Sequence, residues 1–307
     1  MSTVNKEVWL PVIEDKLFVN YEILKTIATD DTANVVKSGS RFRKVYVPQA
    51  GASAGIRING TDGETVNRRT DTALEYALDK FETLPMAVDR EDSLSVSYDK
   101  VNSVVNTMIG DLGEATLYTA FQNWYTGSGS TIVETSGVTG ATTNAPSATG
   151  TRNAFIYKDL LKASEHLSKQ KVPTSGRILL VPTSMAHQLV EDFMFNTGMN
   201  VKFIEKDGLM ILETAIAGFK VIEMPFVLNV DNANNARDFG VSGDTTDNEV
   251  ALAYHPRFVS VAKDDVHFFV NPDVATEYAD VMSAQVFLGA KYRRTDKVGV
   301  IPIVQKA

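Results

Sequence analysis

The side chains of this sequence that are suited to chemistry are few and scattered. Its four histidines lack the spacing of a metal site and lie at His166, His187, His255 and His267. His187 precedes Glu191 by four residues in an expected helix, so the two form the best pair of a general base and its orienting carboxylate. The same spacing is much more common in ordinary surface pairs of helices, and we favour that interpretation.

A polar loop between residues 229 and 248 offers oxygen ligands for Ca²⁺, from Asp231, Asp238, Asp244 and Asp247. Their order differs from that of a calcium-binding loop, which favours a solvated loop instead. The patterns of nucleotide-binding loops, zinc proteases and serine hydrolases are absent from the sequence. We therefore expect no catalytic residue, no cofactor and no metal ion.

Charged side chains gather in two further places. Asp89, Glu91 and Asp92 form an acidic run, which is usually a solvated face; in an assembly of identical chains it is suited to pair with Arg68 and Arg69 of a neighbouring copy. The densest basic group is too small to make nucleic-acid binding the main task, and it comprises Lys291, Arg293, Arg294 and Lys297.

The composition is that of a folded protein and excludes several classes. The 307 residues are 44% hydrophobic and 22% charged, enough for one large domain or two ordinary ones. The net charge of −8 argues against general nucleic-acid binding and suits a container that repels DNA weakly. The absence of cysteine excludes disulfides and thiolate metal sites. We expect no signal peptide, and no apolar run approaches the roughly 20 residues that span a bilayer.

The first ninety residues indicate parts that leave the main body. Residues 1–45 have weak periodicity and form either an arm that packs along a partner or the first helix and strand of a core. Residues 42–88 predict a long β-hairpin, with alternating apolar residues on either side of the turn signals Asn59-Gly60 and Asp62-Gly63. Such a hairpin is too long to bury itself on a small core, so it is expected to reach a partner; the alternative is a hairpin lying flat on its own domain.

The strongest helix is predicted over residues 97–125, roughly 40 Å long at 1.5 Å per residue, and ends before Gly127. A loop rich in Gly, Ser and Thr follows over residues 127–151. Residues 155–228 predict a compact α/β unit, with helices over 156–169 and from 183 to about 195 and a buried strand over 177–181. After the 229–248 loop the pattern is that of β-strands to the end of the chain.

Three stretches together resemble the major capsid proteins of tailed bacteriophages. The first contains Gly176-Arg177-Ile178-Leu179-Leu180-Val181-Pro182 and, later, Ile216-Ala217-Gly218-Phe219-Lys220-Val221-Ile222-Glu223. The second is Ala251-Leu252-Ala253-Tyr254-His255-Pro256, and the third is Leu288-Gly289-Ala290-Lys291-Tyr292-Arg293-Arg294. The resemblance is one of order and pattern from residue 40 onward.

This resemblance implies an α+β fold of the Hong Kong 97 type. It divides the chain into an N-terminal arm (1–45), an extended β-hairpin called the E-loop (46–88), a peripheral domain with the long spine helix (89–126), an α/β axial domain (127–280) and a return to the peripheral domain (281–307). The E-loop is then expected to lie on a neighbouring subunit. Some members crosslink an E-loop lysine covalently; here Lys80 lies near the hairpin base and none at the tip, so we predict no crosslink.

The function implied is that of a major capsid protein, self-assembling into hexamers and pentamers of an icosahedral head around double-stranded DNA. Its expected partners are other copies of itself together with portal, scaffolding and decoration proteins, with weak contact to DNA and none to a membrane. Assembly is expected in the host cytoplasm, and the product in the virion. The alternatives are an encapsulin-like nanocompartment shell, a soluble α+β enzyme, and a phage tail or adhesin component.

Overall fold

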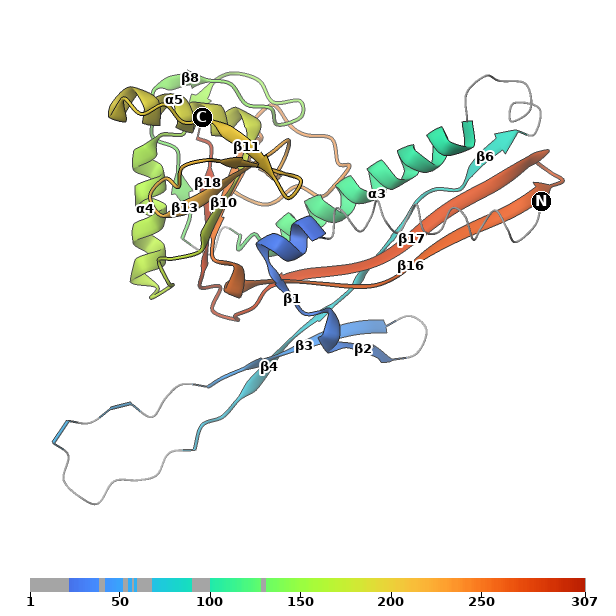
Figure 1. Ribbon diagram of the computed structural model, residues 1–307, viewed down its shortest axis with the longest axis horizontal. Helices are drawn as coiled ribbons and strands as arrows, with labels where there is room; N and C mark the ends of the chain where they lie inside the picture. Colours follow the sequence, from blue (N-terminus) through green and yellow to red (C-terminus); the bar gives the residue numbers. More distant parts are fainter. Residues whose placement is uncertain are drawn as a thin grey trace.

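The computed structural model describes residues 22–38, 42–51, 55–56, 58–59, 68–89, 100–127 and 131–306. Figure 1 shows an α/β body, an elongated extension made of α3 above a ribbon of two long strands, and a hairpin that projects below the ribbon. The three parts meet where the ribbon enters the body.

The ribbon consists of β16 (Val259–Val274) and β17 (Ala279–Tyr292), which pair antiparallel. β5 (Asp79–Glu82) and β6 (Met86–Asp89) pair with the other edge of β17, and β1 (Thr29–Asp30) pairs with β16. α3 (Lys100–Trp124) covers one face of this sheet. Because its apolar residues recur at helical spacing, they meet the side chains that alternate along the strands: Val105, Met108, Ile109 and Leu112 against Phe268, Met282, Ala284 and Val286.

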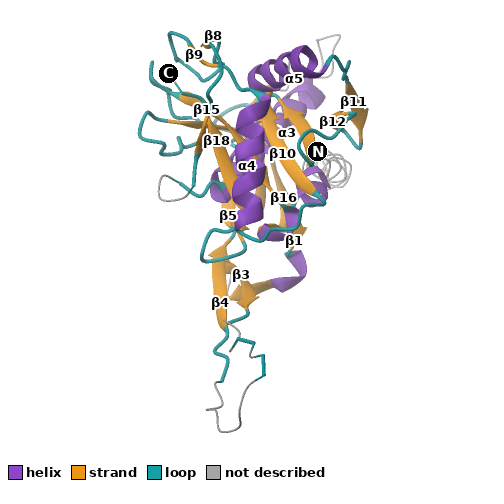
Figure 2. Ribbon diagram, turned by 90° about the vertical axis from the view of Figure 1, so that its left-hand side faces the viewer, coloured by secondary structure: helices purple, strands orange, loops and turns teal. Residues whose placement is uncertain are grey.

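The body is built on an eight-stranded sheet that is buried on both faces. Its main path is β11 (Phe203–Lys206), β12 (Leu209–Leu212), β13 (Phe219–Met224), β10 (Arg177–Pro182), β15 (Asn248–Tyr254), β18 (Val300–Val304) and β7 (Val133–Glu134), with β14 (Leu228–Val230) beside β15. α4 (Tyr157–Lys169) and α5 (Thr183–Thr197) cover one face (Figure 2). The end of α3 and the helical residues 22–27 cover the other.

The remaining strands are short. β2 (Val35–Ser38), β3 (Phe42–Gln49) and β4 (Thr72–Ala77) make a three-stranded antiparallel sheet at the hairpin root. β8 (Thr139–Ala141) pairs with β9 (Arg152–Asn153) within the Gly/Ser/Thr-rich loop. The short 3₁₀ turns are η1 (Thr32–Asn34) and η2 (Pro256–Phe258).

Most predicted elements are confirmed within a few residues. The long helix covers 100–124 of the predicted 97–125, and its predicted first turn lies outside the described residues. The buried strand predicted over 177–181 is β10, in which every residue is buried. After Arg177 it is hydrophobic throughout rather than alternating, because helices cover both faces of its sheet.

Four predicted boundaries differ from the structure. Of the predicted arm, the helical residues 22–27 pack on the chain's own body, since Leu24 and Ile27 are almost fully buried. Of the predicted hairpin 46–88, residues 79–82 and 86–88 instead pair with β17. Residues 259–274, assigned to the axial domain, form the ribbon with β17. Residues 300–304, expected to return to the peripheral sheet, pair with β15 in the body. β16 and β17 are consecutive in sequence, so that boundary divided a hairpin. In the other three cases the contacting segments are distant in sequence, so local patterns carried no information about them.

Candidate functional site

The projecting hairpin is the part of the molecule that lacks a core of its own. β3 and β4 pair in register from Lys44–Ala77 to Gln49–Thr72. Just beyond, the Gly51 N–H donates to Asp71 Oδ1 at 2.9 Å. The strands approach so closely here that a Cβ on Gly51 would lie 2.1 Å from the Thr70 carbonyl oxygen, which leaves room only for glycine.

The hairpin root is anchored by a small apolar cluster. Val45, Val47, Leu74 and Tyr76 alternate along the two strands and are all buried. Together with Leu78 they pack against Ala262 of β16 and Phe287 of β17. The root is therefore a fixed part of the ribbon rather than a free hinge.

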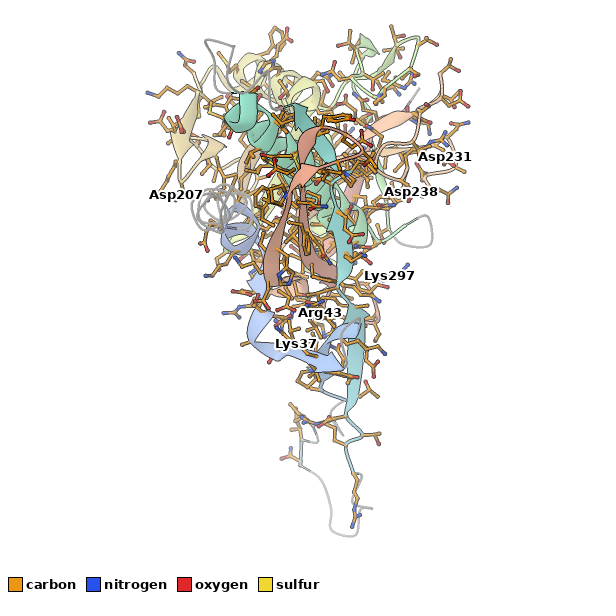
Figure 3. All side chains as sticks on the ribbon, turned by 90° about the vertical axis from the view of Figure 1, so that its right-hand side faces the viewer. Lys37, Arg43, Asp207, Asp231, Asp238 and Lys297 are labelled. Carbon is orange, nitrogen blue, oxygen red and sulfur yellow. The ribbon has the colours of Figure 1, made fainter. Side chains whose placement is uncertain are left out.

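Charged side chains reinforce this anchor. The Arg43 guanidinium forms an ion pair with Asp264 and lies 3.6 Å above the centre of the Phe287 ring. Lys37 Nζ is 2.7 Å from Asp264 Oδ1. Burial alone raises the pKa of Asp264, but hydrogen bonds from the two cations outweigh it and hold that pKa below its usual value. Figure 3 places Lys37 and Arg43 where the hairpin leaves the body.

A buried polar junction connects the root to the rest of the fold. Arg293 Nη2 is 3.1 Å from Asp31 Oδ1, and the pKa of Asp31 is raised by burial despite this cation. Gln49 Nε2 donates to the Arg293 carbonyl at 2.6 Å. The Trp124 indole N–H donates to the Ser260 carbonyl at 3.0 Å. Helix α3, the ribbon and the hairpin thus share one hydrogen-bonded junction.

Beyond the root, the described side chains of the hairpin are largely exposed. Ile56 is 95% exposed and Ile58 is 85% exposed, an unfavourable position for aliphatic side chains in a lone molecule. Arg68 and Arg69 are also exposed. Arg69 Nε lies 2.7 Å from Asp71 Oδ1, so this arginine already has a partner within the hairpin.

Of the acidic residues predicted to pair with these arginines, the structure describes only the backbone of Asp89. Asp89 ends β6, which lies at the opposite end of the molecule from the hairpin in Figure 1. The side chain of Asp89, and the whole of Glu91 and Asp92, lie outside the described residues. The hairpin and β6 are not brought together within one chain, and a contact between copies stays a prediction.

The aspartate-rich loop is held by its own hydrogen bonds. Asp238 accepts from Gln122 Nε2 at 2.7 Å, and Arg237 Nη2 lies 2.7 Å from Asp247 Oδ1. Asp231 accepts the Asn235 N–H at 2.8 Å, and Asp244 accepts from Thr245. Among the described residues, no three His, Asp or Glu side chains come together as metal ligands. The predicted calcium ligands therefore serve separate structural contacts.

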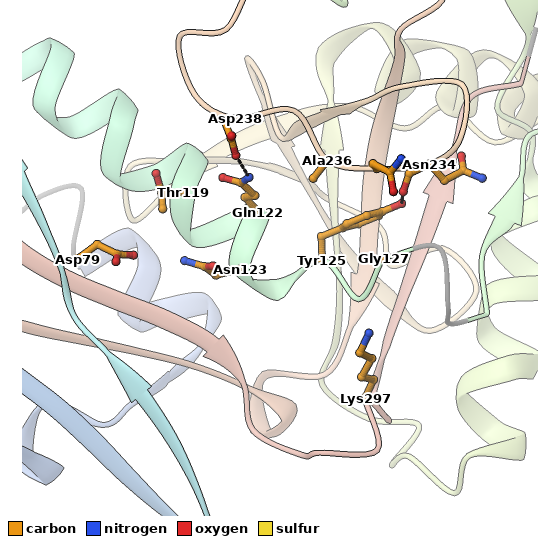
Figure 4. A pocket seen from close by; sticks show the side chains of 11 residues that line it. Asp79, Thr119, Gln122, Asn123, Tyr125, Gly127, Asn234, Ala236, Asp238 and Lys297 are labelled. Carbon is orange, nitrogen blue, oxygen red and sulfur yellow. Dashed lines mark hydrogen bonds between the residues drawn. The ribbon is translucent and has the colours of Figure 1, made fainter.

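A polar cavity of about 640 Å³ lies between this loop and the end of α3 (Figure 4). The Tyr125 hydroxyl donates to the Asn234 carbonyl at 2.8 Å across one side of it. Lys297 Nζ donates to the Thr126 carbonyl at 2.7 Å, where it compensates the carbonyl end of the helix. Two hydrogen bonds in this lining, from Gln122 to Asp238 and from Tyr125 to Asn234, join the loop to α3.

The other candidate residues also have structural roles. His187 Nε2 lies 3.8 Å from Glu223 Oε1 and is highly exposed, and no contact with the predicted Glu191 is seen among the described residues. The predicted basic group is largely compensated, since Arg294 pairs with Asp296 at 2.6 Å and Arg293 with Asp31. Neither group forms a reactive centre or a continuous positive surface.

Buried charged residues in the body were missed by sequence reasoning. Arg177 is 2% exposed and donates to the carbonyls of Ser164, Val172 and Pro173. Arg152, also 2% exposed, joins the two polar loops by donating to Asn248 Oδ1 at 2.5 Å and to the Asp247 carbonyl at 2.9 Å. A polar stretch before each arginine is the only sequence signal, and it does not reveal which carbonyls need a donor.

Comparison with solved structures relates this geometry to known proteins. The capsid of Ralstonia phage GP4 is 13% identical with a TM-score of 0.58, covering 92% of this chain and 87% of its own. The capsid of cyanophage P-SCSP1u is 16% identical with a TM-score of 0.55, covering 90% and 86%. That of Helicobacter pylori bacteriophage KHP30 is 14% identical with a TM-score of 0.55, covering 87% and 84%. This chain has a phage capsid fold.

The capsid fold confirms the predicted α+β class. No protein-family model matches the sequence, and comparison with curated protein sequences finds no match. At sequence identities of 13 to 16%, these comparisons establish a shared fold and do not transfer the role of any individual residue to this chain. Among the residues described, no helix has the length and apolar character needed to cross a membrane.

Proposed function

We propose that this protein is a major capsid protein, which self-assembles into the hexamers and pentamers of an icosahedral phage head around double-stranded DNA. The similar solved structures are capsids of bacteriophages and share its architecture over nearly their whole length. The role is structural, without a catalytic site.

The observation that carries this proposal is the hairpin, whose root is anchored and whose described residues beyond the root are exposed. Val45 is fully buried at the root, while Ile56 is 95% exposed further out. Aliphatic side chains exposed to water on an anchored hairpin are unfavourable in a lone molecule, and such exposed apolar surface is typical of a site that a partner covers. In a shell of identical subunits, that partner is another copy.

Contacts of this kind are heterologous, because the hairpin of one subunit meets a different surface of the next. Heterologous contacts close into rings when the rotation between subunits divides a full turn. Hexamers and pentamers are such rings. Each subunit is held at several places at once, so individually weak contacts add up to a stable shell.

The charge distribution suits a container for DNA rather than a DNA-binding wrapper. The net charge is −8, and Arg293 and Arg294 are both paired with carboxylates of the same chain. We expect weak contact with the packaged DNA, and portal, scaffolding and decoration proteins as additional partners. Assembly in the host cytoplasm and a final location in the virion follow from the same proposal.

The main alternative is a nanocompartment shell, which has the same fold and encloses an enzyme. Purified shells distinguish the two by their contents, since a phage head protects DNA from nuclease and a compartment holds a cargo protein. A portal and a terminase gene nearby support the phage head, whereas a gene for a cargo enzyme supports the compartment.

The proposal is tested by deleting residues 50–68. The β3–β4 register ends at Gln49–Thr72, so the deletion keeps every strand pair and leaves residues 69–71 as a three-residue connection. We expect a folded subunit, with an unchanged circular dichroism spectrum, that forms no shells in electron micrographs. Normal shells from this variant would refute the proposal.

A further inference from the structure

A second cavity, of about 390 Å³, lies between α3, the 229–248 loop and the segment 144–146. We call it the loop cavity. Its volume falls in the range of about 300 to 1,000 Å³ that is typical of small-molecule sites, and its lining combines aromatic rings with carboxylates. These two kinds of side chain together indicate which ligand the cavity accepts.

Three aromatic rings line the loop cavity and contact one another. The ring centre of Tyr118, on α3, lies 6.2 Å from that of Phe226 and 5.7 Å from that of Phe239. Phe226 is half-buried and Phe239 is 43% exposed, so part of this aromatic surface is open to a ligand. Aromatic faces attract cations within about 6 Å of the ring centre, and alkyl groups pack on the same surface.

The charges of the lining are unbalanced. Four carboxylates, those of Glu114, Asp238, Asp247 and Glu249, stand against the single guanidinium of Arg237. Arg237 already pairs with Asp247, whose oxygens lie 2.7 to 3.2 Å from its Nε and Nη2. The part of the chain that the structure describes pairs no cation with the other three carboxylates. This excess of negative charge excludes an anion as the ligand and favours a cation.

Glu249 is the most deeply buried of these three carboxylates, at 4% exposed. Its Oε2 accepts hydrogen bonds from the Asn144 N–H at 2.9 Å and from the hydroxyls of Thr143 and Ser184. These neutral donors hold the side chain in place without compensating its charge, and the described residues place no donor on Oε1. Burying a carboxylate is costly unless it is paired, so a ligand cation that reaches Glu249 has a strong interaction to gain.

The loop is held at the cavity before any ligand arrives. The Tyr118 hydroxyl donates to the Arg237 carbonyl at 3.1 Å. Gln122 Nε2 donates to Asp238 Oδ1 at 2.7 Å, the bond drawn as a dashed line in Figure 4. Both bonds tie the residues that directly precede Phe239 to α3. A wall that is already fixed loses little conformational entropy when it binds a ligand.

We propose that the loop cavity binds an alkylammonium ion, with the ammonium group near Glu249 and the carbon chain against the rings of Tyr118 and Phe239. A bare metal ion does not fit, because no three His, Asp or Glu side chains of the described residues come together as ligands. A free diamine and the side chain of a lysine share the required chemistry. The site is independent of the proposed shell function.

Isothermal titration calorimetry of the full-length subunit with diaminopentane tests the site, and pentanediol is the neutral probe of the same length. We expect binding of one diamine per chain and no heat from the diol. Glu249→Gln should weaken diamine binding about tenfold or more, and Phe239→Leu about two- to fivefold. Glu205→Gln and Phe195→Leu are the matched controls with wild-type affinity, since both residues are exposed and lie on β11 and α5.

Glu114→Gln is a further variant, chosen because Glu114 is exposed on α3 and its replacement does not put folding at risk. It should weaken diamine binding about two- to threefold, and thermal denaturation without ligand checks that every variant is folded. A wild-type protein that binds no diamine overturns the site. Equal binding of the diol overturns the cation as ligand, and wild-type affinity in every folded variant of Glu114, Phe239 and Glu249 overturns its position.

The same titration on assembled shells separates the two sources of the ligand. Undiminished binding to shells identifies a free amine. Binding to subunits that is absent from shells identifies a lysine side chain that fills the cavity on assembly. Either result supports the alkylammonium site. Shells that form from a protein without diamine binding overturn the site alone, and a diamine-binding protein that never assembles overturns only the shell function.

Discussion

Replacing the two hairpin isoleucines by serine should weaken assembly strongly and leave the subunit itself intact. Ile56 and Ile58 are 95% and 85% exposed, so the double variant loses almost no burial within one chain. Its free energy of unfolding should change by less than about 0.5 kcal/mol per substitution, as for surface positions generally. Burial against a neighbour is worth about 1.5 to 3 kcal/mol for each isoleucine.

The two side chains together therefore contribute about 3 to 6 kcal/mol to each contact between subunits. At 1.4 kcal/mol per tenfold change, this weakens the contact by roughly 10² to 10⁴-fold. Light scattering over a concentration series measures the threshold for shell formation, and urea denaturation of the unassembled subunit measures its stability. Wild-type assembly by a variant of unchanged stability would show that the tip side chains are not buried in the shell.

Three further predictions concern the subunit alone. Gly299→Ala should destabilise the subunit by about 2 to 4 kcal/mol in denaturant titration, since φ is +96° there and a Cβ would lie 2.2 Å from the Phe258 ring. Gly110→Ala should stabilise the subunit by about 0.5 to 1 kcal/mol in the same titration, because a Cβ at this helical position meets nothing within 4 Å. Burial raises the pKa of Tyr125 to about 12, so its contribution to the free energy of unfolding is present below pH 10 and should be lost as the pH rises towards 12. Tyr125→Phe should reduce this loss of stability with pH. The same dependence of unfolding free energy on pH in the variant would contradict the prediction.

Local patterns predicted the elements well and their partners poorly. The spacing of Val104, Val105, Met108 and Leu112 predicted α3, and its register is confirmed by the burial of three of these side chains. The turn signals near Asn59 predicted a hairpin, and Asn59 indeed has a positive φ of 53°. Both features depend on residues close in sequence.

The sheet memberships depend on contacts that local patterns do not encode. β18 follows β17 directly in sequence, yet it pairs with β15, about fifty residues earlier, and lies parallel to β7. Likewise, the anchor of the hairpin requires Arg43 to meet Asp264 and Phe287, which are more than two hundred residues away. The pairing of Arg68 and Arg69 with carboxylates of another copy stays a prediction, because no property of a single chain identifies such a contact.

Electron microscopy of the purified full-length protein tests the central claim most directly. If the bare hairpin exists to bind other copies of the same chain, the images should show closed icosahedral shells built of hexamers and pentamers. A uniform population of single 33.6 kDa particles at every concentration tried, with the hairpin intact, would contradict the account.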